Sequence, residues 1–120
     1  MTDQFDRIAA LVAPGVPVTW SAELPPGWRG FDGAGLAWGS TIWISPTLAN
    51  PSFRFYLTLV HELAHVAVGP ERGHSRAWLD RTIDGMHRLV DEGIARLPMP
   101  GLDTATQLAF IRQDLERTYA

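Results

Sequence analysis

The sequence contains no cysteine and no lysine, and its ten basic residues other than histidine are all arginine. The absence of cysteine excludes disulfides, thiolate nucleophiles, and zinc or iron–sulfur sites that depend on thiolate ligands. The absence of lysine excludes a Schiff-base lysine and the lysine of a phosphate-binding loop. Any metal site must therefore use histidine, aspartate or glutamate.

The sequence also lacks a strong excess of charge and a long apolar run. Its formal net charge is −3 with histidine neutral, which argues against a nucleic-acid partner. No run approaches the roughly 18 apolar residues of a membrane span. The first residues, Met1 to Arg7, carry two acids and no basic segment of a secretory signal. We expect a cytoplasmic protein without a membrane partner.

The composition that remains is that of a globular domain. Apolar residues make up 46% of the 120 residues and charged residues 19%. This length suits one domain with one core, and the sequence has no internal repeat or domain boundary. We expect a single domain over residues 1–120.

The N-terminal half predicts one short helix followed by strands. Apolar residues at helical spacing indicate the helix, and two apolar runs on either side of Gly39-Ser40 indicate a hairpin. A Gly/Pro-rich stretch before the hairpin is typical of a loop. The predicted segments are helix 3–13, strand 16–20, loop 25–35 and hairpin strands 36–38 and 41–44.

The C-terminal half predicts three helices. Asn50 as N-cap and Pro51 in the first turn indicate the start of a buried, strongly apolar helix. Gly69-Pro70 ends this helix. The three predicted ranges are 51–68, about 75–91, and a last helix capped by Asp103 or Thr104 that carries Leu108, Ile111 and Leu115 on one face.

The first of these helices carries the sequence His61-Glu62-Leu63-Ala64-His65, which is an H-E-x-x-H motif. Residues four apart lie on one helix face, so both imidazoles can bind the same cation. Glu62 is offset by about 100° and can reach a metal-bound water without binding the metal. This pattern predicts a zinc ion, Zn²⁺, with Glu62 as general base.

A catalytic zinc site needs a third protein ligand, and the sequence offers several. His74 follows the Gly69-Pro70 break, where a tight turn can return it to the His61/His65 face. Glu71, Asp80 and Asp84 are alternatives, because a carboxylate shortly after the motif or on the next helix can also reach the metal.

With these residues the sequence resembles the zincin metallopeptidases, and among them the SprT-like and WLM-type minimal zinc proteases. The resemblance covers roughly residues 36–90: strand Thr41–Ser45, the H-E-x-x-H motif, and His74 with Trp78 four residues later. It implies a minimal zincin-like α+β domain, with a small antiparallel or mixed sheet packed on the H-E-x-x-H helix. It also implies His61, His65 and His74 as zinc ligands, Glu62 as catalytic base, and strand 41–45 as the edge strand that pairs with substrate.

A second resemblance is to the ImmA/IrrE-like group, through Thr58-Leu59-Val60 before His61. That group uses a downstream carboxylate as third ligand, and some members cleave repressors. SprT-like proteins carry a basic DNA-binding extension, and we expect none here because the net charge is −3.

We therefore expect a zinc-dependent endopeptidase of the H-E-x-x-H type whose partner is a protein or peptide substrate. The alternatives are a non-catalytic zincin-fold binding module and a repressor-cleaving regulatory protease. The sequence leaves the substrate and the oligomeric state open.

Overall fold

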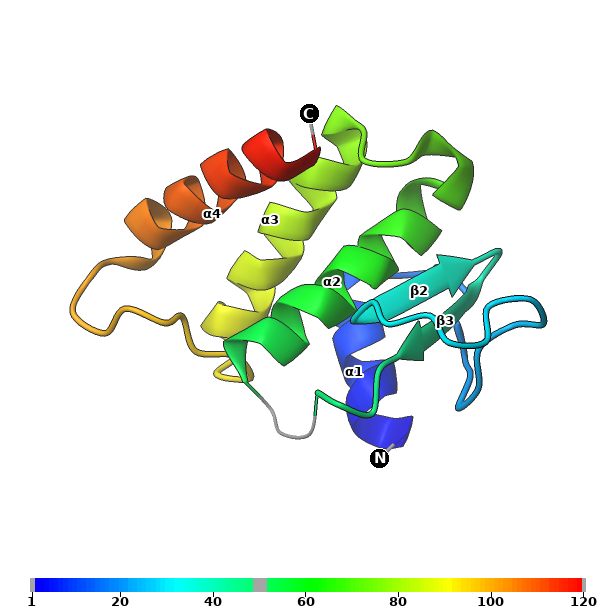
Figure 1. Ribbon diagram of the computed structural model, residues 1–120. Coiled ribbons are helices and arrows are strands. Elements are labelled where there is room, and N and C mark those ends of the chain that lie inside the picture. The colour runs from blue at the N-terminus through cyan, green and yellow to red at the C-terminus, as the bar shows by residue number, and fades with distance from the viewer. Residues whose placement is uncertain (1, 49–51, 120) are drawn as a thin grey trace.

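The computed structural model describes residues 2–48 and 52–119 (Figure 1). Over these residues the chain forms an α+β fold of four α-helices and one three-stranded mixed sheet. The helices are α1 (Thr2–Val12), α2 (Phe53–Val68), α3 (Arg76–Asp91) and α4 (Thr104–Tyr119), with a 3-10 turn η1 (Pro70–Arg72); the strands are β1 (Thr19–Trp20), β2 (Gly35–Trp38) and β3 (Thr41–Ile44).

The sheet confirms the predicted hairpin and corrects the predicted edge strand. β2 and β3 pair antiparallel around Gly39, whose φ of 56° suits a tight turn. β1 is shorter than the predicted strand 16–20 and pairs with β3 in parallel, so the strand order is β1-β3-β2. The expectation that strand 41–45 is the edge was wrong, because β3 pairs on both sides. Among the described strands, β2 borders the sheet on the side away from β1.

Helix α2 forms the centre of the core, as its apolar sequence predicts. Leu59, Val60 and Leu63 have no exposed surface. The predicted cap Asn50 and the following Pro51 lie outside the described residues. The helix begins instead after Ser52, whose hydroxyl accepts a hydrogen bond from the Phe55 N–H at 3.3 Å.

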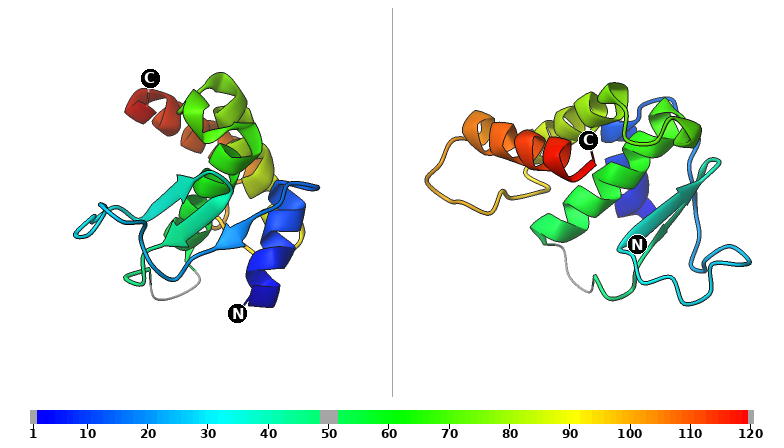
Figure 2. Two further views of the ribbon diagram at one scale, coloured as in Figure 1. Left: turned by 90° about the vertical axis from the view of Figure 1, so that its right-hand side faces the viewer. Right: turned by 45° about the horizontal axis from the view of Figure 1, so that its top comes forward.

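Helix α3 fits closely between α1 and α2 because of a glycine. A Cβ atom at Gly85 would lie 2.9 Å from side-chain atoms of both Val12 and Val60, so a larger residue would push the helices apart. Helix α3 contacts both α1 and α2, and α2 is the helix that packs on the sheet (Figure 2). This packing fixes the angle at which α3 returns beside α2.

Helix α4 packs along α3, and its C-terminal end lies beside the start of α3 (Figure 1). The predicted face of Leu108, Ile111 and Leu115 makes this contact. Gln107 fixes the preceding linker: its side chain accepts from the Met99 N–H at 2.9 Å and donates to the Leu102 carbonyl at 2.8 Å. The last turn of α4 therefore lies at the end of the molecule where α3 begins (Figure 1).

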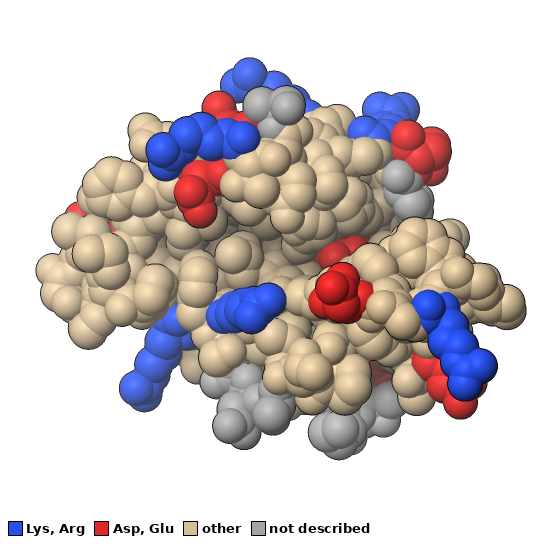
Figure 3. Space-filling model, in the orientation of Figure 1, with Lys and Arg blue, Asp and Glu red and all other residues tan. Residues whose placement is uncertain are grey.

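In the part of the chain that the structure describes, every helix is too short or too polar to cross a membrane. On the face seen in Figure 3, arginine and acidic side chains are scattered among each other, and neither sign forms a continuous patch.

Candidate metal centre

His61 and His65 lie one turn apart on the same face of α2. Their Nε2 atoms are 3.2 Å apart, and both side chains are partly buried. Residues four apart on a helix are spatial neighbours, so the helix alone brings the two imidazoles together. The H-E-x-x-H spacing therefore predicts this half of the site from the sequence.

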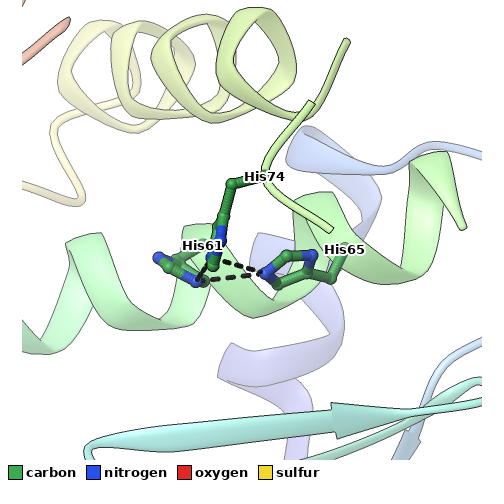
Figure 4. Close-up of side chains that lie close together, drawn as sticks. All are labelled: His61, His65 and His74. Atoms are coloured by element: carbon green, nitrogen blue, oxygen red, sulfur yellow. Dashed lines mark hydrogen bonds between the residues drawn. The ribbon is translucent and has the colours of Figure 1, made fainter. Parts of the chain in front are cut away.

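The turn between α2 and α3 brings His74 next to His61 and His65. Gly69 ends α2 with a φ of 113°, and Gly73 adopts a φ of 59°, both in the region that favours glycine. Ser75 then caps α3 by accepting the Trp78 N–H at 3.3 Å. These constraints place His74 Nε2 3.2 Å from the Nε2 atoms of both His61 and His65 (Figure 4).

The three nitrogens fit a zinc ion better than they fit three hydrogen bonds. A neutral imidazole has one N–H, so a triangle of three Nε2 atoms cannot form a hydrogen bond along every edge. Zinc binds histidine nitrogen at about 2.0–2.1 Å, and tetrahedral angles then separate two such nitrogens by about 3.3 Å. The observed 3.2 Å on each edge is close to that value. Three ligands leave one tetrahedral position for water or substrate.

The electrostatics keep the three imidazoles neutral, which is the form that binds zinc. Burial lowers the pKa of His61 to about 3, with the neighbouring His65 and His74 adding to the shift. Burial and His74 together lower the pKa of His65 to about 4. Burial also lowers the pKa of His74. A cation arriving at neutral pH therefore does not have to displace protons from the cluster.

Trp78 packs against the three histidines and restricts their positions. It is 1% exposed, its indole N–H donates to the His61 carbonyl at 3.1 Å, and its ring contacts all three imidazoles. In the structure it packs against both the turn and the H-E-x-x-H helix.

Glu62 is buried beside the cluster, at 7% exposure. Its carboxylate lies 3.9 Å from His61 Nε2, and burial raises its pKa to about 7. A carboxyl with a pKa near neutrality can both accept and return a proton. A cation at the three nitrogens would favour its charged form.

The edge strand β2 runs beside Glu62. A Cβ atom at Gly35 would lie 3.0 Å from Glu62 Cγ and 3.1 Å from Thr58 Cγ2, so glycine permits the close approach of β2 to α2. Gly35 falls within the predicted loop 25–35, so the contact between β2 and Glu62 is not among the sequence predictions. A Gly at the start of a predicted strand is the signal that could have indicated it.

The three carboxylates considered as alternative third ligands lie away from the histidine cluster. Asp80 pairs with Arg112, and Asp84 pairs with Arg88 at 3.6 Å, both on the exposed surface. Glu71 is exposed on η1 and lies against Gly69. Within residues 2–48 and 52–119, the group that could hold a metal consists of three histidines and no carboxylate.

Tyr119 also lies at the site, although it is not among the residues predicted from the sequence. Its ring stacks on His74 with centroids 4.0 Å apart, and it lies 5.4 Å from the His61 ring. Burial, with the charge of Glu62, raises the pKa of its hydroxyl. Tyr119 lies four residues after Leu115 and therefore on the same face of α4 as the predicted apolar residues. This spacing is the sequence signal that places Tyr119 on the side of α4 that faces α3.

Comparisons with family models, with curated proteins and with solved structures find no match for this chain.

Proposed function

We propose that this protein is a zinc-dependent endopeptidase with a zincin-like fold, in which His61, His65 and His74 hold the metal. The observation that carries the proposal is the triangle of three Nε2 atoms, each 3.2 Å from the other two, with the Glu62 carboxylate beside it. The all-histidine ligand set supports the resemblance to SprT-like and WLM-type proteases over that to the ImmA/IrrE-like group.

The chemistry assigned to the chain is proton transfer during hydrolysis. When bound, zinc would supply a Lewis acid for the scissile carbonyl and lower the pKa of a water. Glu62 accepts a proton as water oxygen bonds to the carbonyl carbon, and it returns a proton to the nitrogen as the C–N bond breaks. Its burial beneath β2 keeps its carboxylate close to the cluster.

The free edge of β2 is the proposed binding strand for an extended peptide. Ser45 N–H bonds to the Ala34 carbonyl, and antiparallel pairs alternate, so main-chain groups of Gly35 and Ala37 face away from β3. An added strand there would run past Glu62, which lies against Gly35.

The test is the E62Q variant with E71Q as matched control. E71Q changes an exposed acid of the same type outside the cluster. We expect wild type, E62Q and E71Q to bind one zinc each, by elemental analysis. On a mixed peptide library, E62Q should hydrolyse about 10²–10⁴-fold more slowly than the other two. Full activity in E62Q, or activity that survives complete zinc removal, would overturn the proposal.

A further inference from the structure

The sheet has a second apolar face, on the side away from the main core. Successive residues of a strand point to opposite faces. Ala37 and Ile42 lie directly opposite each other and pack in the main core, so the residues beside them point outward. The outward residues of the three strands are all uncharged: Thr19, Leu36, Trp38, Thr41 and Trp43. This face therefore suits an uncharged partner.

The chain itself covers the part of this face that belongs to β3. Phe31, in the loop before β2, packs against Trp43 with ring centroids 6.1 Å apart, and Trp43 is 7% exposed. Leu36 lies directly opposite Trp43. Trp38 lies opposite the smaller Thr41 and is only half-buried. The aromatic surface that remains accessible is therefore on the edge strand.

The free main-chain groups of β2 lie next to Trp38. Gly35 and Ala37 direct their N–H and carbonyl groups away from β3, and within the described residues β3 is the strand that pairs with β2. An extended peptide that bonds to these groups would continue the sheet. Its residue opposite Gly35 would point toward Glu62, whereas its residue opposite Trp38 would point to the outward face.

The register of such a peptide brings one of its side chains close to Trp38. Trp38 directs its own main-chain groups to β3, so it would form a pair without hydrogen bonds with an added antiparallel strand. The Cα atoms of such a pair are about 4.5 Å apart, compared with about 5.5 Å in a hydrogen-bonded pair, and the side chains are closer. The residue opposite Trp38 would lie three positions before the residue opposite Gly35.

We infer that Trp38 binds an aromatic or β-branched side chain of the substrate, three residues before the one that lies opposite Gly35. The inference rests on the proposed peptidase function, and it narrows the substrate class to extended segments that carry such a residue on their outward side. Pairs of an aromatic with an aromatic or β-branched side chain stabilise neighbouring strands. Trp38 is then a specificity residue on the face of the sheet opposite to Glu62.

The first test compares Trp38→Thr with Trp28→Thr. Threonine suits a strand, so the first variant keeps β2. Trp28 is the control, because it is 45% exposed and its ring contacts Phe31 in the loop. Thermal melting checks that both variants fold, and Trp38→Phe is a second variant that keeps an aromatic ring.

The measurement is kcat/KM for one cleaved peptide in which tyrosine replaces alanine at each position in turn. We expect one position at which tyrosine raises kcat/KM by about 2–10-fold in wild type and in Trp28→Thr. Trp38→Thr should lose the gain at this position alone, and Trp38→Phe should keep it.

The second test does not require cleavage. Zinc-loaded E62Q is titrated with acetyl-Thr-Tyr-Thr-Tyr-Thr-amide and with acetyl-Thr-Ala-Thr-Ala-Thr-amide, and NMR follows the indole N–H signals of Trp38 and Trp28. The tyrosine peptide should shift the Trp38 signal more than the alanine peptide at equal concentration, and neither should shift Trp28. In E62Q/W38T, the amide signals of Gly35 and Ala37 should report equal affinity for the two peptides.

The outcomes separate the two proposals. Peptide cleavage with the same tyrosine gains in Trp38→Thr as in wild type, and equal binding of both peptides to E62Q, would overturn the role of Trp38 and leave the peptidase function standing. A tyrosine-dependent shift at Trp38 in a protein that cleaves no peptide would support the role of Trp38 and overturn the peptidase function. Shifts at Trp28 that spare Trp38 would overturn the role of Trp38 in either case.

Discussion

Trp78 donates its indole N–H to the main-chain carbonyl of His61 over 3.1 Å, and its ring lies edge-on to the imidazole of the same residue, with centroids 4.8 Å apart. The first contact joins α3 to α2, and the second fixes a proposed ligand. Residues that orient metal ligands commonly change metal affinity by 10–100-fold when they are altered.

Trp78→Phe should lower zinc affinity by about tenfold and reduce the free energy of unfolding by 1–3 kcal/mol. The variant loses the hydrogen bond from the indole N–H to the His61 carbonyl and opens a small void. Competition with a zinc chelator and thermal melting measure the two effects. Trp28→Phe is the control, because Trp28 is 45% exposed and far from the ligands along the chain. If both variants lose the same zinc affinity and the same stability, Trp78 does not position the metal ligands.

The identity of the third ligand gives a second prediction. His74→Gln should lower zinc affinity by more than the roughly 10–100-fold expected of a residue that only orients a ligand. Asp84→Asn and His87→Gln should leave the affinity unchanged, because both side chains are more than half exposed and pair with α3 neighbours. Zinc titration of the metal-free variants provides the measurement. A larger loss in Asp84→Asn than in His74→Gln would reassign the ligand.

The sequence predicts those parts of the site that depend on interactions between residues close together in the chain. The i, i+4 spacing of His61 and His65 needs only a helix, and α3 begins close to the predicted start near residue 75, with Ser75 as its cap. Gly69 and Gly73 provide the positive φ angles of the turn that carries His74. These features depend on steric and hydrogen-bonding rules within a few residues.

The missed features depend on packing between distant segments. The apolar residues of strand 41–44 indicate a strand that packs in the core, but not which strands lie on either side of it. The pairing of Thr19 with Thr41, across 22 residues, makes β3 the central strand. Tyr119 reaches His74 only because α4 docks on α3 at a particular angle, which no local pattern specifies.

The close contact between β2 and α2 gives a third prediction. Gly35→Ala places a Cβ 3.0 Å from Glu62 Cγ and should displace the carboxylate by a few tenths of an ångström. We expect peptide hydrolysis to fall by about 10-fold, with zinc content unchanged, because small misplacements of a catalytic group are costly. Activity and zinc content are measured on the same preparation. Leu36→Ala, on the opposite face of β2, is the control for strand disruption. Unchanged hydrolysis in Gly35→Ala would show that Glu62 tolerates this shift.

The pKa shifts predict how the stability of the metal-free protein depends on pH. The folded-state pKa values of His61 and His65 are lowered to about 3 and 4, whereas the unfolded values are near 6.5. Between about pH 4 and 6.5 the unfolded chain therefore binds more protons at these residues, and they destabilise the fold as the pH falls. Glu62 acts in the opposite direction, because its raised pKa lets the folded state hold a proton between pH 4.5 and about 7.

The histidines outnumber Glu62, so the free energy of unfolding of the metal-free protein should fall as the pH is lowered from 7 to 5. Each proton contributes at most about 1.4 kcal/mol per pH unit. Urea unfolding in the presence of a chelator measures the slope. E62Q should steepen it, and His61→Gln should flatten it. A stability that rises toward pH 5 in the wild type would mean that the burial of Glu62 dominates that of the histidine cluster.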